Sequence, residues 1–408
     1  MEKAGLQKAA KTLLFVAMMF ASVIAYGEAE VDEREIEEAR LQQVFRDGMA
    51  TIVEDLNQGS FKRFVRAIDK QDMLDRIFGL RLIDQRIQRD FREDMKKSDD
   101  FENFISTTFK NEAKDGIRAR LLTVESRGTR GRAVIRFDMS HFQANYIDYE
   151  LRLDEKERLV IVDWDDYLWG HRFSDRTGLM FVQGQPNVNA VRKLIDYPNV
   201  REAEIFQVME ALKAARDFDF ERYFGIFAKL DDKLKRQRAI LVVGLDASKL
   251  ARKRRNQRKL LEAVDQYYPK DPLFALSLLD YYFPDRQYQK AYDALTRLKN
   301  KLRVDDGVTN ARLSAATLVM GQVEDALAFA NKSVEQEPEL ELGWWAVLRA
   351  QVAAGNNAAA IASLDTLSTT FNHDLGPEAL SKDPSLKEFA RTAEYRGWHE
   401  KNAASDQG

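Results

Sequence analysis

The sequence contains no cysteine in 408 residues, and only four histidines and eight prolines. Without cysteine the protein can form neither disulfide bonds nor thiolate metal sites, and catalysis by a thiol is excluded. The absence of stray thiols also suits a protein that enters an oxidising compartment. Stability must therefore come from apolar cores, for which 45% hydrophobic residues are sufficient.

An excess of charge of one sign is also missing. The 63 lysines and arginines nearly balance 66 aspartates and glutamates, so the formal net charge is -3. Bulk electrostatics therefore give no reason to expect a nucleic-acid partner. The sequence has no glycine-rich phosphate loop, no Gly-x-Ser-x-Gly elbow and no His-Glu-x-x-His helix. We predict no cofactor and no enzymatic activity.

The first 25 residues have the pattern of an export signal. Lys3, Lys8 and Lys11 precede an apolar run over residues 13–24. This run is shorter than the roughly 20 residues that a membrane-spanning helix needs, so a cleaved signal is favoured over a permanent anchor. No cysteine follows the run to carry a lipid, which argues against a lipoprotein. We predict a signal peptide over residues 1–25 and export, most simply to a bacterial periplasm.

The N-terminal half changes from helical to strand periodicity. Apolar residues at three- and four-residue steps predict helices over residues 31–56, 61–68, 73–95 and 101–109. A period of two then predicts strands over residues 117–125, 132–139, 145–153 and 159–164. In the second strand Arg132, Arg136 and Asp138 share one face. We predict an α+β domain over residues 31–182, with helices on a four-stranded antiparallel sheet.

This element order, with the strand at residues 159–164, resembles the nuclear-transport-factor-2-like fold, a cone of sheet closed by helices. The resemblance implies an apolar pocket inside the cone, although such folds host enzymes, ligand binders and structural modules alike. An enzyme or small-ligand binder using that pocket is the alternative function, with the helical half serving oligomerisation or targeting. Asp163, Asp165 and His171 would be its candidate acid–base or metal residues. A hydrogen-bonded strand end is the favoured explanation of these residues, because nothing in the sequence supplies a partner group from another element.

A turn-rich linker is predicted at residues 183–200, and almost everything after it has helical periodicity. Paired helices are predicted over residues 203–216, 220–230, 238–245 and 249–268. Further on, the spacing between Gly321 and Gly355 is that of a stacked helical hairpin, about 34 residues. An alanine, Ala326 or Ala360, stands at the same short distance after each glycine. A unit of this length must stack on its neighbours to bury its apolar face.

These units resemble tetratricopeptide repeats. Ala291, Ala326 and Ala360 stand where the two helices of such a hairpin cross closely, whereas Arg286 departs from the pattern by replacing the turn glycine. The segments assigned on this basis are repeat-like hairpins at residues 201–271, repeats at residues 272–374, a capping helix at residues 375–400 and a disordered tail at residues 401–408. The fold class is thus an α+β domain followed by an α-solenoid.

The resemblance implies that the first helix of each hairpin lines a concave groove for a peptide or protein partner. The residues that would face this groove are Asp280, Phe283, Leu318, Trp345 and Arg349. Adjacent positions on a helix face about 100° apart, so Trp344 and Trp345 cannot both fill one core site. An exposed Trp345 beside Arg349 would have the composition of a binding hot spot. The alternative is that Trp345 packs on the closing helix of its own chain.

Seven basic residues occur within residues 249–259. They are Lys249, Arg252, Lys253, Arg254, Arg255, Arg258 and Lys259. In an exported protein such a patch indicates anionic lipid, acidic glycan or an acidic protein surface. The alternative is a solvated helix face whose long side chains cover Leu250 and Leu261. No aromatic residues interleave with the charges, so a platform for single-stranded nucleic acid is unsupported.

These patterns together predict an exported, non-enzymatic scaffold or adaptor that holds a peptide or protein partner in a solenoid groove. The sequence leaves the oligomeric state open.

Overall fold

The fold is that of a computed structural model, which describes residues 33–79, 84–97, 103, 118–139, 142–184, 186–195 and 199–405. The predicted signal peptide and, apart from Asn103, the predicted helix over residues 101–109 lie outside this range. Among the described residues, none of the helices combines the length and hydrophobicity of a membrane span. The described part is mostly helical, with one sheet in its N-terminal half.

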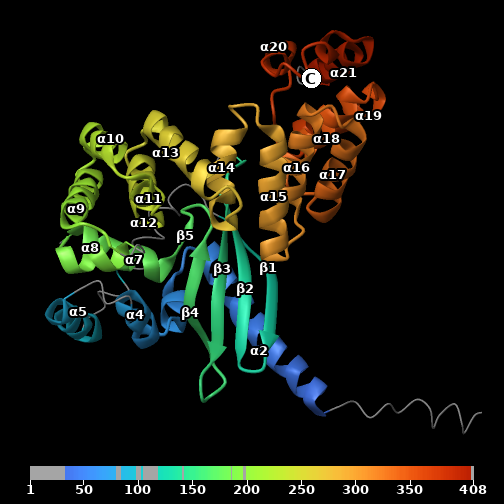
Figure 1. The fold of residues 1–408 in the computed structure, drawn as a ribbon. Helices are drawn as coiled ribbons and strands as arrows, with labels where there is room; N and C mark the ends of the chain where they lie inside the picture. Colours follow the sequence, from blue (N-terminus) through green and yellow to red (C-terminus); the bar gives the residue numbers. More distant parts are fainter. Residues whose placement is uncertain are drawn as a thin grey trace, which may run out of the picture.

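An antiparallel sheet of five strands lies at the centre of the molecule (Figure 1), and its strands neighbour one another in chain order. They are β1 (Arg118–Arg127), β2 (Arg130–Asp138), β3 (Ala144–Leu153), β4 (Leu159–Asp166) and β5 (His171–Arg172). The predicted meander is confirmed. The prediction of four strands missed β5, because two residues are too few to show a period of two.

One face of the sheet packs against α2 (Glu33–Asn57), which lies across β1 and β2. Gln42 and Asn57 of α2 donate side-chain hydrogen bonds to the carbonyls of Val124 and Ala119. A β-carbon at Gly131 of β2 would come within 2.8 Å of the Phe45 ring. Glycine therefore allows the helix to approach the strand this closely.

The helices around this layer differ from the prediction in two places. The single helix expected over residues 73–95 is two helices, α4 (Lys70–Gly79) and α5 (Gln85–Lys97). Phe78 and Phe91 meet edge to face between them, with ring centroids 5.8 Å apart. Each helix keeps the apolar period, so periodicity alone could not reveal the break. The other helices described in this region are α3 (Lys62–Ala67) and α7 (Phe173–Gly184).

The predicted linker at residues 183–200 contains a packed helix, α8 (Val188–Leu194). Its Val191 is fully buried, and Asn187 caps the helix by accepting a hydrogen bond from the backbone N–H of Ala190. One hydrophobic core extends from Leu41 of α2 to Leu313 in the helical half. The two halves therefore share a core instead of forming domains joined by a linker.

Helical hairpins occupy the rest of the described chain and fan out beside one end of the sheet (Figure 1). The five hairpins are α9–α10 (Glu202–Arg216, Phe220–Lys229), α12–α13 (Arg238–Leu250, Arg254–Tyr267), α14–α15 (Ala275–Tyr282, Tyr288–Leu302), α16–α17 (Gly307–Val319, Val323–Gln336) and α18–α19 (Glu341–Ala353, Asn357–Thr369). The short helices α11 (Asp232–Lys235), α20 (Pro377–Ser381) and the closing helix α21 (Ala393–Ser405) complete the set. Because α21 extends to Ser405, most of the tail predicted as disordered is helical.

The five hairpin turns have the same backbone conformation. Their left-handed residues are Phe218 (φ 56°), Arg252 (φ 53°), Arg286 (φ 57°), Gly321 (φ 78°) and Gly355 (φ 74°). In each turn the N–H of this residue bonds to the carbonyl three positions earlier, and the next N–H bonds to the carbonyl five positions earlier. Paired bonds of this type close a helix in the Schellman motif. Successive turn residues are separated by the length of one tetratricopeptide unit, about 34 residues.

The repeat therefore begins near α9 and comprises five units within the described residues. The sequence analysis assigned the turn residue in the last three units, with Arg286 in place of glycine in the third, and did not assign it in the first two, which have no glycine at the turn. The second hairpin also differs from its prediction, since α12 continues to Leu250 instead of ending near residue 245. Its turn is formed by Arg252, which the sequence analysis had placed inside a helix.

The turn conformation predicts opposite effects of glycine and alanine. A residue with a β-carbon in the left-handed region costs about 1 kcal/mol, so Arg286→Gly should raise the free energy of unfolding and Gly321→Ala should lower it, each by about 1 kcal/mol. Gly225→Ala is the control, because Gly225 lies inside α10 with open space at its β-carbon; this change should not destabilise. Chemical denaturation followed by circular dichroism measures all three. Equal changes in the free energy of unfolding for Gly321→Ala and Gly225→Ala would contradict the left-handed conformation assigned to Gly321.

Candidate functional site

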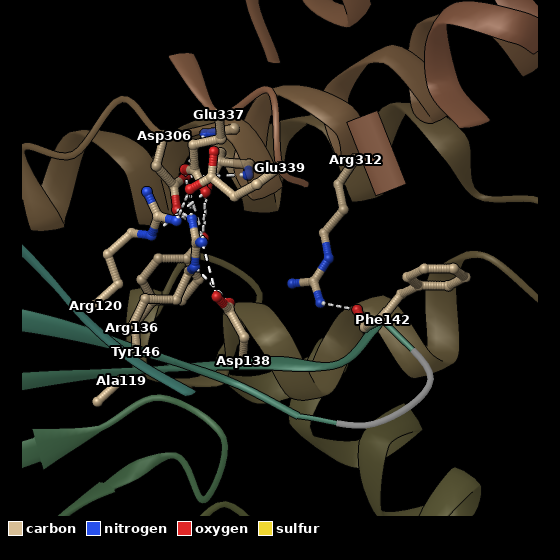
Figure 2. Close-up of polar contacts among 12 residues, drawn as sticks. Ala119, Arg120, Arg136, Asp138, Phe142, Tyr146, Asp306, Arg312, Glu337 and Glu339 are labelled. Atoms are coloured by element: carbon tan, nitrogen blue, oxygen red, sulfur yellow. Dashed lines mark hydrogen bonds and ion pairs between the residues drawn. The ribbon is translucent and has the colours of Figure 1, made fainter. Parts of the chain in front are cut away.

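The second face of the sheet meets the hairpins through a buried arginine (Figure 2). Arg136 of β2 has no exposed surface. Its guanidinium donates to Asp306 at 2.5 Å, to Glu337 at 2.7 Å and to Asp138 at 2.6 Å. Burial disfavours the charged form, but the hydrogen bonds to Glu337 and Asp138 outweigh it and raise the pKa of Arg136. The arginine is therefore a permanent cation.

Both repeat carboxylates also hold the ends of helices. Asp306 is the N-cap of α16 and accepts the backbone N–H of Thr309 at 3.1 Å. Glu337, which follows α17, accepts the N–H of Gly307 at 2.8 Å. The Tyr146 hydroxyl of β3 donates to Asp306 at 2.8 Å. Each carboxylate thus receives donors from the sheet and from the hairpins, which satisfies its lone pairs away from water.

Two more arginines on the same sheet face extend this contact. Arg120 lies opposite Arg136 in the β1–β2 register, forms an ion pair with Glu339 and lies 3.6 Å from Glu337. Arg132 donates to the carbonyl of Leu302 at the end of α15, at 3.3 Å. We call the group formed by Arg120, Arg136, Asp138, Tyr146, Asp306, Glu337 and Glu339 the Arg136 junction. It fixes the fourth hairpin on the sheet, and Arg132 adds a bond to the third.

The β4–β5 turn makes a separate contact with the second and third hairpins. The ammonium of Lys249 in α12 donates to the Leu168 carbonyl at 2.5 Å and to the Ser277 hydroxyl at 2.8 Å. His171 of β5 lies 3.2 Å from Asp246 of α12. Lys249, the first residue of the basic stretch, therefore has a structural role.

The structure separates the three residues considered for acid–base or metal chemistry. Asp163 is buried, which raises its pKa, and it accepts the hydroxyl of Ser174 at 2.6 Å. Asp165 pairs with Arg172 at 3.0 Å, and His171 turns to Asp246. Among the described residues, no group of three metal-ligating side chains comes together. These contacts match the hydrogen-bonded strand end that the sequence analysis weighed against catalysis.

Two of the predicted groove residues contact the C-terminal segment of the same chain. The Trp345 indole N–H donates to Glu341 at 3.0 Å, and its ring meets that of His373 edge to face, with ring centroids 5.4 Å apart. Arg349 lies over the Trp345 ring at 5.4 Å and donates to Asp383 at 2.7 Å. His373 and Asp383 precede the closing helix α21, and Trp345 also packs against the hydrophobic cluster that Tyr395 and Trp398 of this helix join. Both side chains remain half-buried.

The other predicted groove residues lie at the ends of first helices. Asp280 is exposed near the end of α14, and Phe283 is half-buried against Tyr288, with ring centroids 6.3 Å apart. Leu318 is half-buried near the end of α16. Its neighbour Val319 is 51% exposed. Sequence reasoning missed Val319, although its place two residues before the turn glycine could have indicated it.

The β2–β3 connection reaches the same helix. The Arg312 guanidinium of α16 donates to the Phe142 carbonyl at 3.2 Å (Figure 2), and the Phe142 side chain is 45% exposed. The sheet therefore borders the accessible side of α16. We define the α16–α18 face by residues Ala315, Leu318 and Val319 of α16 with Val352 and Ala353 of α18.

Comparison with known proteins leaves the family open. No protein-family model and no curated protein matches the sequence. Among solved structures, MamA MSR-1 C2 is similar over 42% of this chain and 98% of its own, at 14% identity and a TM-score of 0.32. A MamA point mutant is similar over 40% and 94%, at 15% identity and a TM-score of 0.30.

Likeness at this level carries no argument about function. The tetratricopeptide-like organisation rests instead on the five turns and their spacing. The resemblance of the N-terminal half to the nuclear-transport-factor-2-like fold has no support from these comparisons and stays a prediction.

The Arg136 junction predicts a large difference between a buried and an exposed arginine. Arg136→Met leaves Asp306 and Glu337 buried without their cation, so it should lower the free energy of unfolding by about 3–5 kcal/mol. The control is Arg40→Gln, which removes an exposed ion pair with Glu157 and should cost less than about 1 kcal/mol. Urea denaturation measures both.

A triple variant separates the loss of the cation from the loss of packing. Combining Arg136→Met with Asp306→Asn and Glu337→Gln removes the uncompensated charges, so it should be more stable than Arg136→Met alone. A triple variant less stable than the single one would contradict the charge argument.

Proposed function

We propose that the protein is a non-enzymatic interaction scaffold that holds a peptide or protein partner on the α16–α18 face. The observation that carries this proposal is that repeat-equivalent positions on α16 and α18 are apolar and accessible. Leu318 and Val352 occupy the same position of successive repeats and are half-buried. Val319 and Ala353, the next residue of each repeat, are exposed. Stacked hairpins repeat one surface along the array, which suits an extended partner.

The chemistry of the face indicates the kind of partner. Its centre carries small or branched apolar side chains, and Ala315 adds a further exposed position on α16. Arg312 borders one end, and Trp345 with Arg349 borders the other. A segment with alternate apolar side chains would bury this row, while its polar groups would meet the charged ends. Trp345 and Arg349 contribute as a border fixed by Asp383, in place of the free hot spot expected from the sequence.

Rigidity supports the same proposal. The Arg136 junction binds Asp306 before α16 and Glu337 after α17, so the hairpin that contains α16 is bonded to the sheet where it begins and where it ends. The second helix of the face, α18, is held to the C-terminal segment by the bond from Arg349 to Asp383. A surface already ordered before binding loses little conformational entropy when the partner arrives.

We further propose that the chain is exported, on the basis of the lysines and apolar run within residues 1–25. Export would explain why a chain of this length contains no cysteine.

Peptide selection tests the binding face directly. Peptides selected on the purified chain from a random library should carry apolar side chains and should bind wild type in solution. Val319→Arg places a charge in the centre of the face and should weaken these peptides at least tenfold, whereas Ala359→Arg on exposed α19 should leave affinity unchanged. Fluorescence anisotropy measures both constants. Equal affinity for wild type and Val319→Arg would refute this location.

A reporter fusion tests export. Alkaline phosphatase folds into an active enzyme only after its disulfides form, so fusing it behind the full chain in a Gram-negative host reports translocation. We expect high activity that falls at least tenfold when residues 2–25 are deleted, with equal amounts of fusion protein on an immunoblot. Undiminished activity of the deletion would contradict a signal in this segment.

A further inference from the structure

The basic stretch divides into residues with different environments. Lys249 is used inside the fold, and Arg258 pairs with Asp285 at 2.5 Å. Between them, residues 252–255 are exposed basic side chains around the turn of the second hairpin. Within the described part of the chain, none of these four forms an ion pair with a carboxylate. Most exposed arginines elsewhere in the described chain do have such a partner. Since these four cations have none among the described residues, they are available for an external anion.

Exposed apolar side chains accompany these cations. Leu250, two residues before the left-handed Arg252, is 59% exposed. The expectation that the basic side chains cover Leu250 is therefore wrong, whereas Leu261 is buried as expected. In the preceding hairpin, Phe218 occupies the turn position itself and is 49% exposed. A bulky residue is uncommon in the left-handed region.

The two turns belong to one edge of the array. Helices α9 and α12, the first helices of the two hairpins, pack on each other. Hairpins stacked in this way present their turns along a common edge. The edge therefore combines two accessible apolar side chains with four unpaired cations. We call Phe218, Leu250 and residues 252–255 the basic turn edge.

We propose that the basic turn edge binds the surface of a membrane that contains anionic lipid. The four cations would lie at the phosphate level, and Leu250 and Phe218 would enter the boundary between headgroups and acyl chains. This combination of basic and apolar side chains is typical of interfacial membrane binding, in which electrostatic attraction and apolar burial add. The proposal is independent of the partner held on the α16–α18 face.

The same residues fit other anionic partners less well. Single-stranded nucleic acid needs open aromatic rings on which bases stack. Phe218 is exposed, but two further rings near the cations are covered, because Lys259 lies 5.0 Å from the centre of Phe224 and Arg258 lies 5.9 Å from that of Tyr281. Within the described residues the edge therefore offers a single open ring and not a row on which successive bases could stack. An acidic protein would neutralise the cations but would not require the exposed leucine that precedes them. A lipid surface uses both kinds of side chain.

Vesicle co-sedimentation with the full chain is the primary test. We expect binding to vesicles of phosphatidylcholine with phosphatidylglycerol, no measurable binding to phosphatidylcholine alone, and weaker binding as salt is raised. Each cation contributes about fivefold to binding. Changing residues 252–255 to glutamine should therefore weaken binding at least a hundredfold.

A charge-matched variant controls for net charge. It changes four exposed arginines that have carboxylate partners elsewhere, namely Arg63, Arg89, Arg158 and Arg391, to glutamine. This variant loses the same charge but should bind vesicles within about threefold of wild type. Equal loss in both variants, or vesicle binding unaffected by the change at residues 252–255, would overturn the proposal. So would binding of wild type to an acidic protein or single-stranded DNA but not to anionic vesicles.

Site-specific labelling tests insertion and does not depend on the glutamine variants. Because the chain has no cysteine, Leu250→Cys provides a single thiol for an environment-sensitive fluorophore. Anionic vesicles should increase its emission and shift it to shorter wavelength, whereas a label at Ala359→Cys on exposed α19 should not respond. An unchanged spectrum at position 250 under conditions in which the protein sediments with vesicles would contradict insertion of the edge.

Discussion

The arrangement of the whole molecule depends on one buried guanidinium. Arg136 lies on a strand, and two of its three carboxylate partners come from helices about 170 and 201 residues later. Removing such charges from water costs several kcal/mol per ion unless the geometry and the remaining hydrogen bonds are satisfied. Asp306 and Glu337 meet this condition because they also accept backbone N–H groups at the start of α16. The same two carboxylates thus dock the fourth hairpin on the sheet and cap the first helix of that hairpin.

This coupling explains why the chain has a shared core where the sequence suggests two domains. The face of β2 with Arg132 and Arg136 reads as solvent-facing by its period of two, but it is covered by the hairpins. At the far end, Arg349 and Asp383 attach the closing segment to the fifth hairpin. The repeats are therefore restrained by the sheet near the middle and by the C-terminal segment at the end, which leaves the α16–α18 face between two fixed borders.

The sequence predicted the helices and strands better than it predicted how they pack on one another. The four longer strands follow from a period of two, and the last two hairpins follow from Gly321 and Gly355. The first hairpin was predicted as a pair of helices but not as a full repeat, because its turn uses Phe218 and because Tyr223 stands where later units have alanine. The space for Tyr223 comes from the neighbouring helix, since a β-carbon at Gly244 would lie 2.5 Å from the tyrosine hydroxyl oxygen. The small residue at this crossing is thus Gly244 of α12 and not a residue of α10. The helices still approach closely, but the alanine that marks the later repeats is absent from the sequence of this unit.

The positions of the two proposed surfaces follow from the order of the hairpins. The basic turn edge belongs to the first two units, and the α16–α18 face belongs to the fourth and fifth. Between them, the third and fourth units are bonded to the sheet through Arg132 and the Arg136 junction. A chain attached to a membrane by its first units would therefore hold its binding face at a fixed distance and orientation, because the sheet prevents the array from bending at its centre. A solenoid without the sheet would lack this constraint, since each unit would contact only its neighbours.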